Sequence, residues 1–185
     1  MTEEEKCLAG MEYDATDKTL IDKLNRVKDL IWKYNNIRPS MFAEREALLR
    51  EILGKCGKDV FVNQPFYCDY GKNIEVGEGF YANFGFTVLD EGKVIIGDNA
   101  FIGPNVSIYT ACHSTNVEHR NTRREWARGV TIGDNVWIGG SVTICPGVKI
   151  GNGVTIGAGS VVVKDIPDNC VAVGNPAKVI KKLCE

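Results

Sequence analysis

A single aliphatic side chain recurs every six residues through most of this chain. From Ile74 the sequence divides into units such as IEVGEG, FYANFG and VIIGDN, and after a break it resumes at Val130 as VTIGDN, VWIGGS and VTICPG. The third residue of each unit is apolar, and all but the alanine are Val or Ile: Val76, Ala82, Val88, Ile96, Ile102, Ile108, Ile132, Ile138, Ile144, Ile150, Ile156 and Val162. One aliphatic residue in six is too sparse for an amphipathic helix, and it does not alternate as a long strand would. The pattern predicts a solenoid of short strands, each with one β-branched side chain turned inward.

Glycine directly follows the inward residue in seven units, at positions 77, 97, 103, 133, 139, 151 and 157. We expect the backbone to bend at these positions with φ > 0, which glycine adopts without steric cost. Each coil then buries its inward residues against the coils above and below it.

Two segments before residue 57 have the periodicity of helices. From Asp17 to Tyr34 the apolar residues step by three and four, so they lie on one face. A second helix is predicted to begin with Ser40 as its N-cap and to stop at Gly54. Each helix has one apolar face, so both are expected to pack on the solenoid.

The other end of the chain also has a helix signal. Asn175-Pro176 resembles an N-cap followed by a proline at the first helical position, and AKVIKKL then predicts a short helix that caps the open strand edges of the last coil. The predicted organisation is one structural domain with these parts: a helical segment at 1–57, a solenoid at 58–173 with an inserted loop at 112–129, and a C-terminal cap at 174–185.

The composition is that of a globular protein without a basic surface. The chain has 22 basic and 24 acidic residues, a net charge of −2 and a pI of about 5.8, so no nucleic-acid or anionic-membrane partner is expected. The first residues lack the apolar run of an export signal. The seven cysteines are scattered and never spaced as CxxC. We therefore expect reduced thiols in a cytoplasmic protein.

Several segments together resemble one family of enzymes. The segments AGMEYDATDKTL, CDYGKNI, FYANF, IYTACH, GDNVWIGGSV, PGVKIG, VVVKDIPDN and GNPAKVIKKL resemble the maltose/galactoside O-acetyltransferase branch of the hexapeptide-repeat acyltransferases, across nearly the whole chain. The resemblance implies a mainly β fold, a left-handed parallel β-helix of three-sided coils, in a homotrimer with active sites between subunits. It also implies transfer of acetyl from acetyl-CoA to a hydroxyl of a small sugar such as maltose or glucose, with no metal.

Both histidines lie in or beside the break in the repeat. The resemblance makes His113 the general base that takes the proton of the acceptor hydroxyl, while no role is predicted for His119. The hydrogen bond that would fix the tautomer of His113 cannot be identified from the sequence. A Cys–His acyl-enzyme through Cys112 is not expected, because neighbouring residues of an extended segment point to opposite faces.

The resemblance also identifies residues for the acceptor. Asn83 would hold the acceptor and steady the transition state, although an asparagine in a left-handed turn would also fit this position. Sugar hydroxyls would be held by carboxylates, which accept several hydrogen bonds each. The candidate carboxylates are Asp14, Asp69, Asp90 and Glu91, with Asp90 and Glu91 as rivals, and Tyr81 is a further candidate for binding the acceptor. Asp69 stands where the family has a serine, and Glu91 where it has an aspartate, so the acceptor is expected to differ in detail. Solvated surface acids are the alternative for each carboxylate.

A further set of residues matches the coenzyme side of the family's site. The matching residues are Asn83, Trp137, Gly140, Ala158, Val163, Lys164, Lys178 and Lys181. The Gly140 amide is the candidate oxyanion donor. Lys178 and Lys181 replace arginines, so weaker nucleotide binding is expected, because lysine lacks the bidentate fork. Trp137 either lines the pantetheine channel or packs between subunits. The arginines of the insertion either cover a neighbour's cleft or lie in solvent.

Three other functions use the same kind of coil. A zinc site like that of the hexapeptide carbonic anhydrases needs three histidines, and this chain offers two. A scaffold without catalysis would bind no coenzyme A. An acetyltransferase for serine or an antibiotic is a further alternative, which the N-terminal helices of the sugar branch disfavour.

Overall fold

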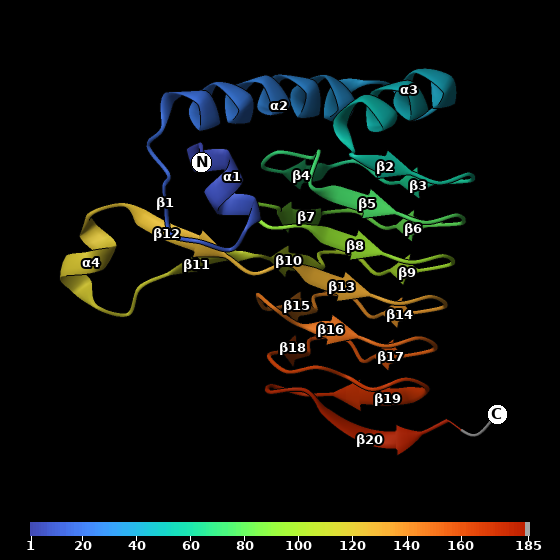
Figure 1. Cartoon of the computed structure of the whole chain (residues 1–185). Coiled ribbons are helices and arrows are strands. Elements are labelled where there is room, and N and C mark those ends of the chain that lie inside the picture. The colour runs from blue at the N-terminus through green and yellow to red at the C-terminus, as the bar shows by residue number, and fades with distance from the viewer. Residues whose placement is uncertain (184–185) are drawn as a thin grey trace.

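The structure, a computed structural model, describes residues 1–183 and shows a three-sided parallel β-helix closed at one end by helices (Figure 1). The first sheet consists of β2 (Lys55–Cys56), β5 (Ile74–Val76), β8 (Val94–Ile96), β13 (Val130–Ile132) and β16 (Lys149–Ile150). The second sheet consists of β3 (Phe61–Val62), β6 (Tyr81–Ala82), β9 (Phe101–Ile102), β14 (Trp137–Ile138), β17 (Thr155–Ile156), β19 (Cys170–Val173) and β20 (Lys178–Lys182). The third sheet consists of β4 (Phe66–Cys68), β7 (Phe86–Leu89), β10 (Ser107–Tyr109), β15 (Thr143–Ile144) and β18 (Val161–Val162).

The six-residue period of the sequence predicted the core of the β-helix correctly. All twelve third residues of the hexapeptide units are at most 2% exposed, so the β-branched side chains form the interior stack. The glycines after them have a different role from the one expected, because none of the seven has a positive φ. The left-handed conformation falls at the sixth residue of the unit instead, as in Gly79 and Asn99.

Close approach of successive coils explains the glycines at the fourth position. A Cβ added at Gly97 would lie 2.8 Å from the carbonyl carbon of Gly133 and 2.9 Å from the amide nitrogen of Asp134, in the next coil. Real Cβ atoms rarely come so near to backbone atoms, and neither coil can move without breaking its own ladder. Glycine is therefore required at this position by packing rather than by dihedral angle.

The N-terminal helices close the first coil. The helices are α1 (Glu3–Leu8), α2 (Lys18–Asn36) and α3 (Phe42–Ile52). The prediction for α2 is confirmed: Asp17 caps it, and its buried face includes Tyr34, whose hydroxyl donates to the carbonyl of Val62 at 2.7 Å. The predicted start of α3 is wrong by one residue, since Met41 is the N-cap and makes no side-chain cap. None of the helices in the described chain is long and apolar enough to cross a bilayer.

The predicted C-terminal helix is wrong. Residues Lys178–Lys182 form β20, which pairs antiparallel with β19. A short segment beside an unpaired strand edge gains ladder hydrogen bonds at once, whereas an isolated helix of this length is marginal. Cys184 and the end of the predicted cap lie outside the described residues.

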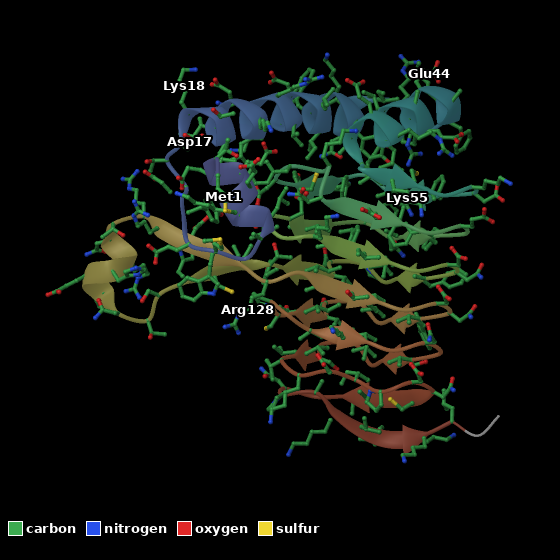
Figure 2. The ribbon with its side chains drawn as sticks, in the orientation of Figure 1. Met1, Asp17, Lys18, Glu44, Lys55 and Arg128 are labelled. Atoms are coloured by element: carbon green, nitrogen blue, oxygen red, sulfur yellow. The ribbon has the colours of Figure 1, made fainter. Side chains whose placement is uncertain are left out.

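The insertion is ordered rather than a plain loop. It contains β11 (Ala111–His113), α4 (Val117–Asn121) and β12 (Arg124–Ala127), and β1 (Tyr13–Asp14) adds to it as a third antiparallel strand. This hairpin sheet, β1-β12-β11, projects from one side of the β-helix (Figure 1). Its side chains extend outward from the base marked by Arg128 (Figure 2).

We predict that Gly97→Ala lowers the free energy of unfolding by about 1–3 kcal/mol, the usual range for overpacking. The added methyl group collides with the backbone of the next coil. Urea unfolding followed by circular dichroism measures the change. Glu78→Ala, at an exposed position on the same side of the β-helix, is the control. Equal stabilities of the two variants would contradict the packing explanation.

Candidate active site

One corner of the β-helix departs from the regular repeat in three successive coils. This corner joins the third sheet to the first: residues 69–73 follow β4, residues 90–93 follow β7, and the insertion follows β10. Because β4, β7 and β10 pair in register, these segments are stacked at one strand spacing, about 4.8 Å. The corner therefore brings Asp69, Asp90 and Glu91 next to the base of the insertion.

Asp90 holds this corner together. Its side chain is fully buried, and its Oδ1 accepts hydrogen bonds from the amides of Asp69 and Tyr70, each at 2.9 Å. Burial raises the pKa of Asp90 to about 6. Of the two rivals for the acceptor, the structure assigns Asp90 to the turn and leaves Glu91 as the candidate.

Asp69 and Glu91 form a carboxyl pair. Burial raises the pKa of Glu91 to about 8, and the neighbouring charge of Asp69 adds to the shift; burial also raises the pKa of Asp69. The hydroxyl of Thr110 lies 3.4 Å from Oε2 of Glu91. Two carboxyl groups that share a proton offer both a donor and acceptors, which suits an acceptor with hydroxyl groups.

His113 is held by a carboxylate that the sequence interpretation did not identify. His113 on β11 is the cross-strand partner of Glu125 on β12, and its Nδ1 lies 3.3 Å from Oε2 of Glu125. The hydroxyl of Tyr13, on β1, donates to the other carboxylate oxygen. Glu125 is buried while the imidazole is about half exposed. A proton on Nδ1 would face Glu125 and leave Nε2 free to accept a proton.

The other two residues near His113 have structural contacts. Cys112 is the cross-strand partner of Trp126, and burial raises the pKa of its thiol, which disfavours a thiolate nucleophile. His119 on α4 places its Nε2 at 2.9 Å from Oε2 of Glu12, at the surface.

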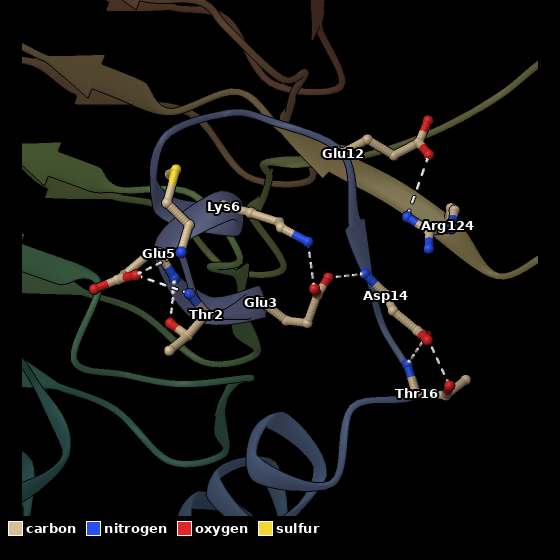
Figure 3. Close-up of polar contacts among 9 residues, drawn as sticks. Thr2, Glu3, Glu5, Lys6, Glu12, Asp14, Thr16 and Arg124 are labelled. Carbon is tan, nitrogen blue, oxygen red and sulfur yellow. Dashed lines mark hydrogen bonds and ion pairs between the residues drawn. The ribbon is translucent and has the colours of Figure 1, made fainter.

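Asp14 lies on the hairpin sheet, but its carboxylate is already engaged. Its Oδ1 accepts from the amide and the hydroxyl of Thr16, at 2.8 and 2.7 Å (Figure 3). These bonds lower the pKa of Asp14. Its own amide donates to Glu3, which in turn pairs with Lys6. An acceptor that binds Asp14 must therefore compete with Thr16 or share the carboxylate with it.

A groove runs along the second sheet and the turns that follow it. Its volume is about 450 Å³. It is lined by Tyr81, Asn83, Phe101, Ile102, Gly103, Pro104, Trp137, Gly139, Gly140, Thr155, Ile156, Gly157 and Ala158. Five of the predicted site residues thus come together: Tyr81, Asn83, Trp137, Gly140 and Ala158.

The groove presents backbone amides that have no acceptor in residues 1–183. On either side of Gly140, the amides of Gly139 and Ser141 donate to carbonyls, while the Gly140 amide donates to none. The same holds for Ala158, between the bonded amides of Gly157 and Gly159. Two free donors on successive coils can bind a chain of carbonyl groups along the groove.

Asn83 lies at the start of the groove. Its Oδ1 accepts from the amide of Phe84 at 2.8 Å, and its backbone is not left-handed, so the alternative of a left-handed turn asparagine does not apply. The hydroxyl of Tyr81 accepts from Nδ2 of Asn63 at 2.9 Å, and its ring stacks on Phe61 with centroids 6.0 Å apart.

The remaining predicted residues lie outside the groove. Lys178 and Lys181 are exposed on β20, in the second sheet that also carries the groove. Val163 and Lys164 are exposed just after β18. The described residues contain no group of three or more His, Cys, Asp or Glu side chains placed to bind a metal.

One chain does not bring the groove and His113 together. The groove follows the second sheet, whereas the hairpin sheet leaves from the corner after the third sheet. Figure 1 shows the hairpin on one side of the β-helix and strands β6, β9, β14 and β17 on the other. The groove and His113 could belong to one site only if copies of the chain lie side by side.

Family models match both the N-terminal helical segment and the β-helix. Residues 6–57 match the maltose acetyltransferase hexapeptide capping motif, residues 129–164 match the bacterial transferase hexapeptide repeats, and residues 93–118 match the hexapeptide repeat of succinyl-transferase.

Relatives and solved structures extend this similarity to the whole chain. Galactoside O-acetyltransferase of Escherichia coli is 42% identical over 97% of this chain and 88% of its own. The crystal structure of a maltose O-acetyltransferase from Clostridium difficile is 51% identical, with a TM-score of 0.99 over 100% of this chain and 99% of the other. A galactoside acetyltransferase in complex with coenzyme A is 41% identical, with a TM-score of 0.96 over 100% and 92%.

The carboxyl pair predicts a pH-dependent stability. Because the folded chain keeps the proton of Glu91 up to about pH 8, while an ordinary glutamate loses it near 4.5, stability falls as pH rises between these values. Above about pH 6 Asp90 has already titrated, so most of the further loss of stability comes from Glu91. Glu91→Gln is therefore expected to remove most of this loss. Urea unfolding between pH 6 and pH 9 measures it, with the exposed Glu78→Gln as control. Parallel curves for the parent and Glu91→Gln would refute the assignment.

Proposed function

Because the chain belongs to the maltose and galactoside O-acetyltransferase family of hexapeptide-repeat proteins, we propose that it transfers the acetyl group of acetyl-CoA to a hydroxyl of a small sugar, with maltose or glucose as the expected acceptor. The observation that carries the proposal is the contact of His113 with the buried Glu125, three residues along the chain from Thr110, whose hydroxyl lies 3.4 Å from Glu91 of the carboxyl pair.

His113 acts as the general base in this proposal. Its Nε2 takes the proton of the acceptor hydroxyl while that oxygen attacks the thioester carbonyl. The Gly140 amide, which lacks an acceptor, donates to the carbonyl oxygen as negative charge develops on it. The C–S bond then breaks, and His113 returns its proton to the departing thiolate. Glu125 stabilises the imidazolium between the two proton transfers.

The groove suits the coenzyme arm. The coenzyme A complex of a relative 41% identical supports binding of the same group here. Pantetheine has amide carbonyls that the free amides of Gly140 and Ala158 can bind, and Trp137 lines the same groove. In the proposal, Lys178 and Lys181 bind the phosphates as single charges, so weaker nucleotide binding than arginines give is expected.

The carboxyl pair favours a sugar over the alternative acceptors. A polyol matches a pair that donates and accepts at once, whereas the carboxylate of serine would meet acidic groups. Acetylation of serine or an antibiotic is the alternative activity, and a scaffold without catalysis is the other. The unpaired cysteines of the described chain suit the reducing cytoplasm, where we place the protein.

We also infer a homotrimer with active sites between subunits. His113 and the groove lie at different corners of the coil. A three-fold arrangement brings the hairpin of one subunit to the groove of the next at every interface, which closes the ring.

The first prediction for function concerns acetyl transfer. Incubated with acetyl-CoA and maltose, glucose, serine or chloramphenicol, the protein releases free thiol fastest with a sugar. His113→Ala lowers kcat by roughly 10²–10⁴-fold, the contribution of a general base, and Glu125→Gln lowers it by a smaller factor because the imidazolium loses its counter-charge. Glu118→Gln, an exposed acid of the same insertion, is the control. Equal rates for His113→Ala and the parent would rule out the base.

The second prediction concerns the shared site. His113→Ala and Asn83→Ala are each nearly inactive as pure proteins. Refolded together in equal amounts, they recover about one quarter of the parent activity, because that share of the interfaces has the intact His113 of one subunit and the intact Asn83 of the other. Activity no higher than that of the pure variants would show that each subunit contains its own complete site.

A further inference from the structure

The proposed general base is the end of a row of three side chains that crosses the hairpin sheet. Tyr13 on β1 is the cross-strand partner of Glu125 on β12, and Glu125 is the cross-strand partner of His113 on β11. Side chains that lie directly opposite each other in antiparallel strands are on the same face of the sheet. The row therefore connects a strand near the start of the chain to the histidine of the insertion.

The tyrosine of this row is fixed by packing. Tyr13 is 1% exposed and belongs to a small buried cluster with Cys7, Leu20 and Ala127. Burial, together with the hydrogen bond to Glu125, raises the pKa of Tyr13 well above its ordinary value. The hydroxyl therefore keeps its proton at neutral pH and acts as a donor.

Polar contacts hold β1 in place on either side of Tyr13. Oε1 of Glu12 lies 3.7 Å from Nη1 of Arg124 on β12 (Figure 3). The amide of Asp14 donates to Oε2 of Glu3 on α1 at 2.6 Å. The outer part of the hairpin has no such support, because α4 contains no buried residue. The hairpin is therefore held at its base, where β1 lies.

The carboxylate of Glu125 has a polar neighbour at each of its two oxygens. The hydroxyl of Tyr13 donates to Oε1, and Nδ1 of His113 lies 3.3 Å from Oε2. The terminal torsion of a glutamate side chain is broad, so a carboxylate held at one oxygen alone can rotate. The hydrogen bond from Tyr13 limits this rotation and keeps Oε2 toward the imidazole. Since the imidazole is half exposed and has little packing of its own, its orientation depends on this contact.

We propose that Tyr13 is a positioning residue for acetyl transfer: its hydroxyl fixes the carboxylate of Glu125, which keeps the proton of the neutral His113 on Nδ1 and leaves Nε2 to accept the proton of the acceptor. The inference rests on the proposed function and adds to it a residue of the N-terminal segment. Tyr13 transfers no proton in this role and does not touch the acceptor.

Removal of the hydroxyl group alone tests this role. Tyr13→Phe keeps the buried ring, and we expect it to lower kcat by roughly 10–10²-fold, the cost of a misoriented catalytic group. The KM values for acetyl-CoA and the sugar acceptor stay unchanged, because Tyr13 binds neither of them. Thiol release at saturating and limiting substrate concentrations measures both constants.

Tyr34→Phe is the matched control, because it also removes a buried tyrosine hydrogen bond, the one to the carbonyl of Val62. Both variants are expected to lower the melting temperature to a similar extent, while Tyr13→Phe alone lowers kcat. Equal kcat values for the two variants would overturn the proposal.

The tautomer of His113 gives a readout that a purely structural role would not change. In protein labelled with ¹⁵N-histidine, long-range ¹H–¹⁵N NMR at alkaline pH distinguishes a proton on Nδ1 from one on Nε2, and His113→Ala assigns the signals. We expect the proton on Nδ1 in the parent and in Tyr34→Phe, and a mixture of both tautomers in Tyr13→Phe. A proton on Nε2 in the parent, or the same tautomer in all three proteins, would contradict the role of Tyr13.

Because the NMR measurement needs no substrate, it separates this inference from the proposed function. A tautomer that depends on Tyr13 supports the inference even if the parent acetylates no sugar. If the parent acetylates sugars while the tautomer does not respond to Tyr13→Phe, the proposed function stands and the role of Tyr13 is refuted. A fall in kcat without a change of tautomer has the same meaning, since the effect would then not pass through Glu125.

Discussion

The backbone ladder between successive coils is the constraint on which the rest of this structure depends. Each coil can lie only one strand spacing from the next, so residues at equivalent corners are stacked in register. The inward Val and Ile side chains keep that register, because a shift of one residue would turn them outward. The free amides of the groove and the carboxyl groups of the irregular corner both take their positions from this ladder, and neither set needs side-chain packing of its own.

The carboxyl groups of Glu125 and Glu91 have different neighbours. Glu125 faces an imidazole and accepts a hydrogen bond from a tyrosine hydroxyl. Glu91 has a second carboxyl group beside it and is buried, so its surroundings favour the proton. In the proposed reaction, the first arrangement would stabilise the imidazolium, and the second is suited to hydrogen bonds with neutral hydroxyl groups. The irregular corner supports both within one stretch of stacked turns.

The repeat predicted the solenoid and its core residues, because one inward residue per side leaves a strict period in the sequence, whereas the groove residues were predicted from the resemblance to the family. The groove residues Asn83, Trp137, Gly140 and Ala158 come together because they occupy similar places in successive coils. Glu125 was missed because its role arises from antiparallel pairing inside the insertion, where no period marks the partner of His113. The strand β20 was missed for a related reason: an open sheet edge, which local sequence does not reveal, overrode the helical pattern of AKVIKKL.

The closure of both ends of the β-helix has a consequence for assembly. Helices α2 and α3 cover one end, and at the other β20 forms a short outer edge with three lysines, Lys178, Lys181 and Lys182. Such an edge repels an identical edge and resists the addition of another strand. Within residues 1–183, this edge therefore disfavours extension of the coil end to end into a fibre and leaves the flanks for self-association. A molecule built from a repeat that could in principle continue without limit is thus confined to a particle of fixed length.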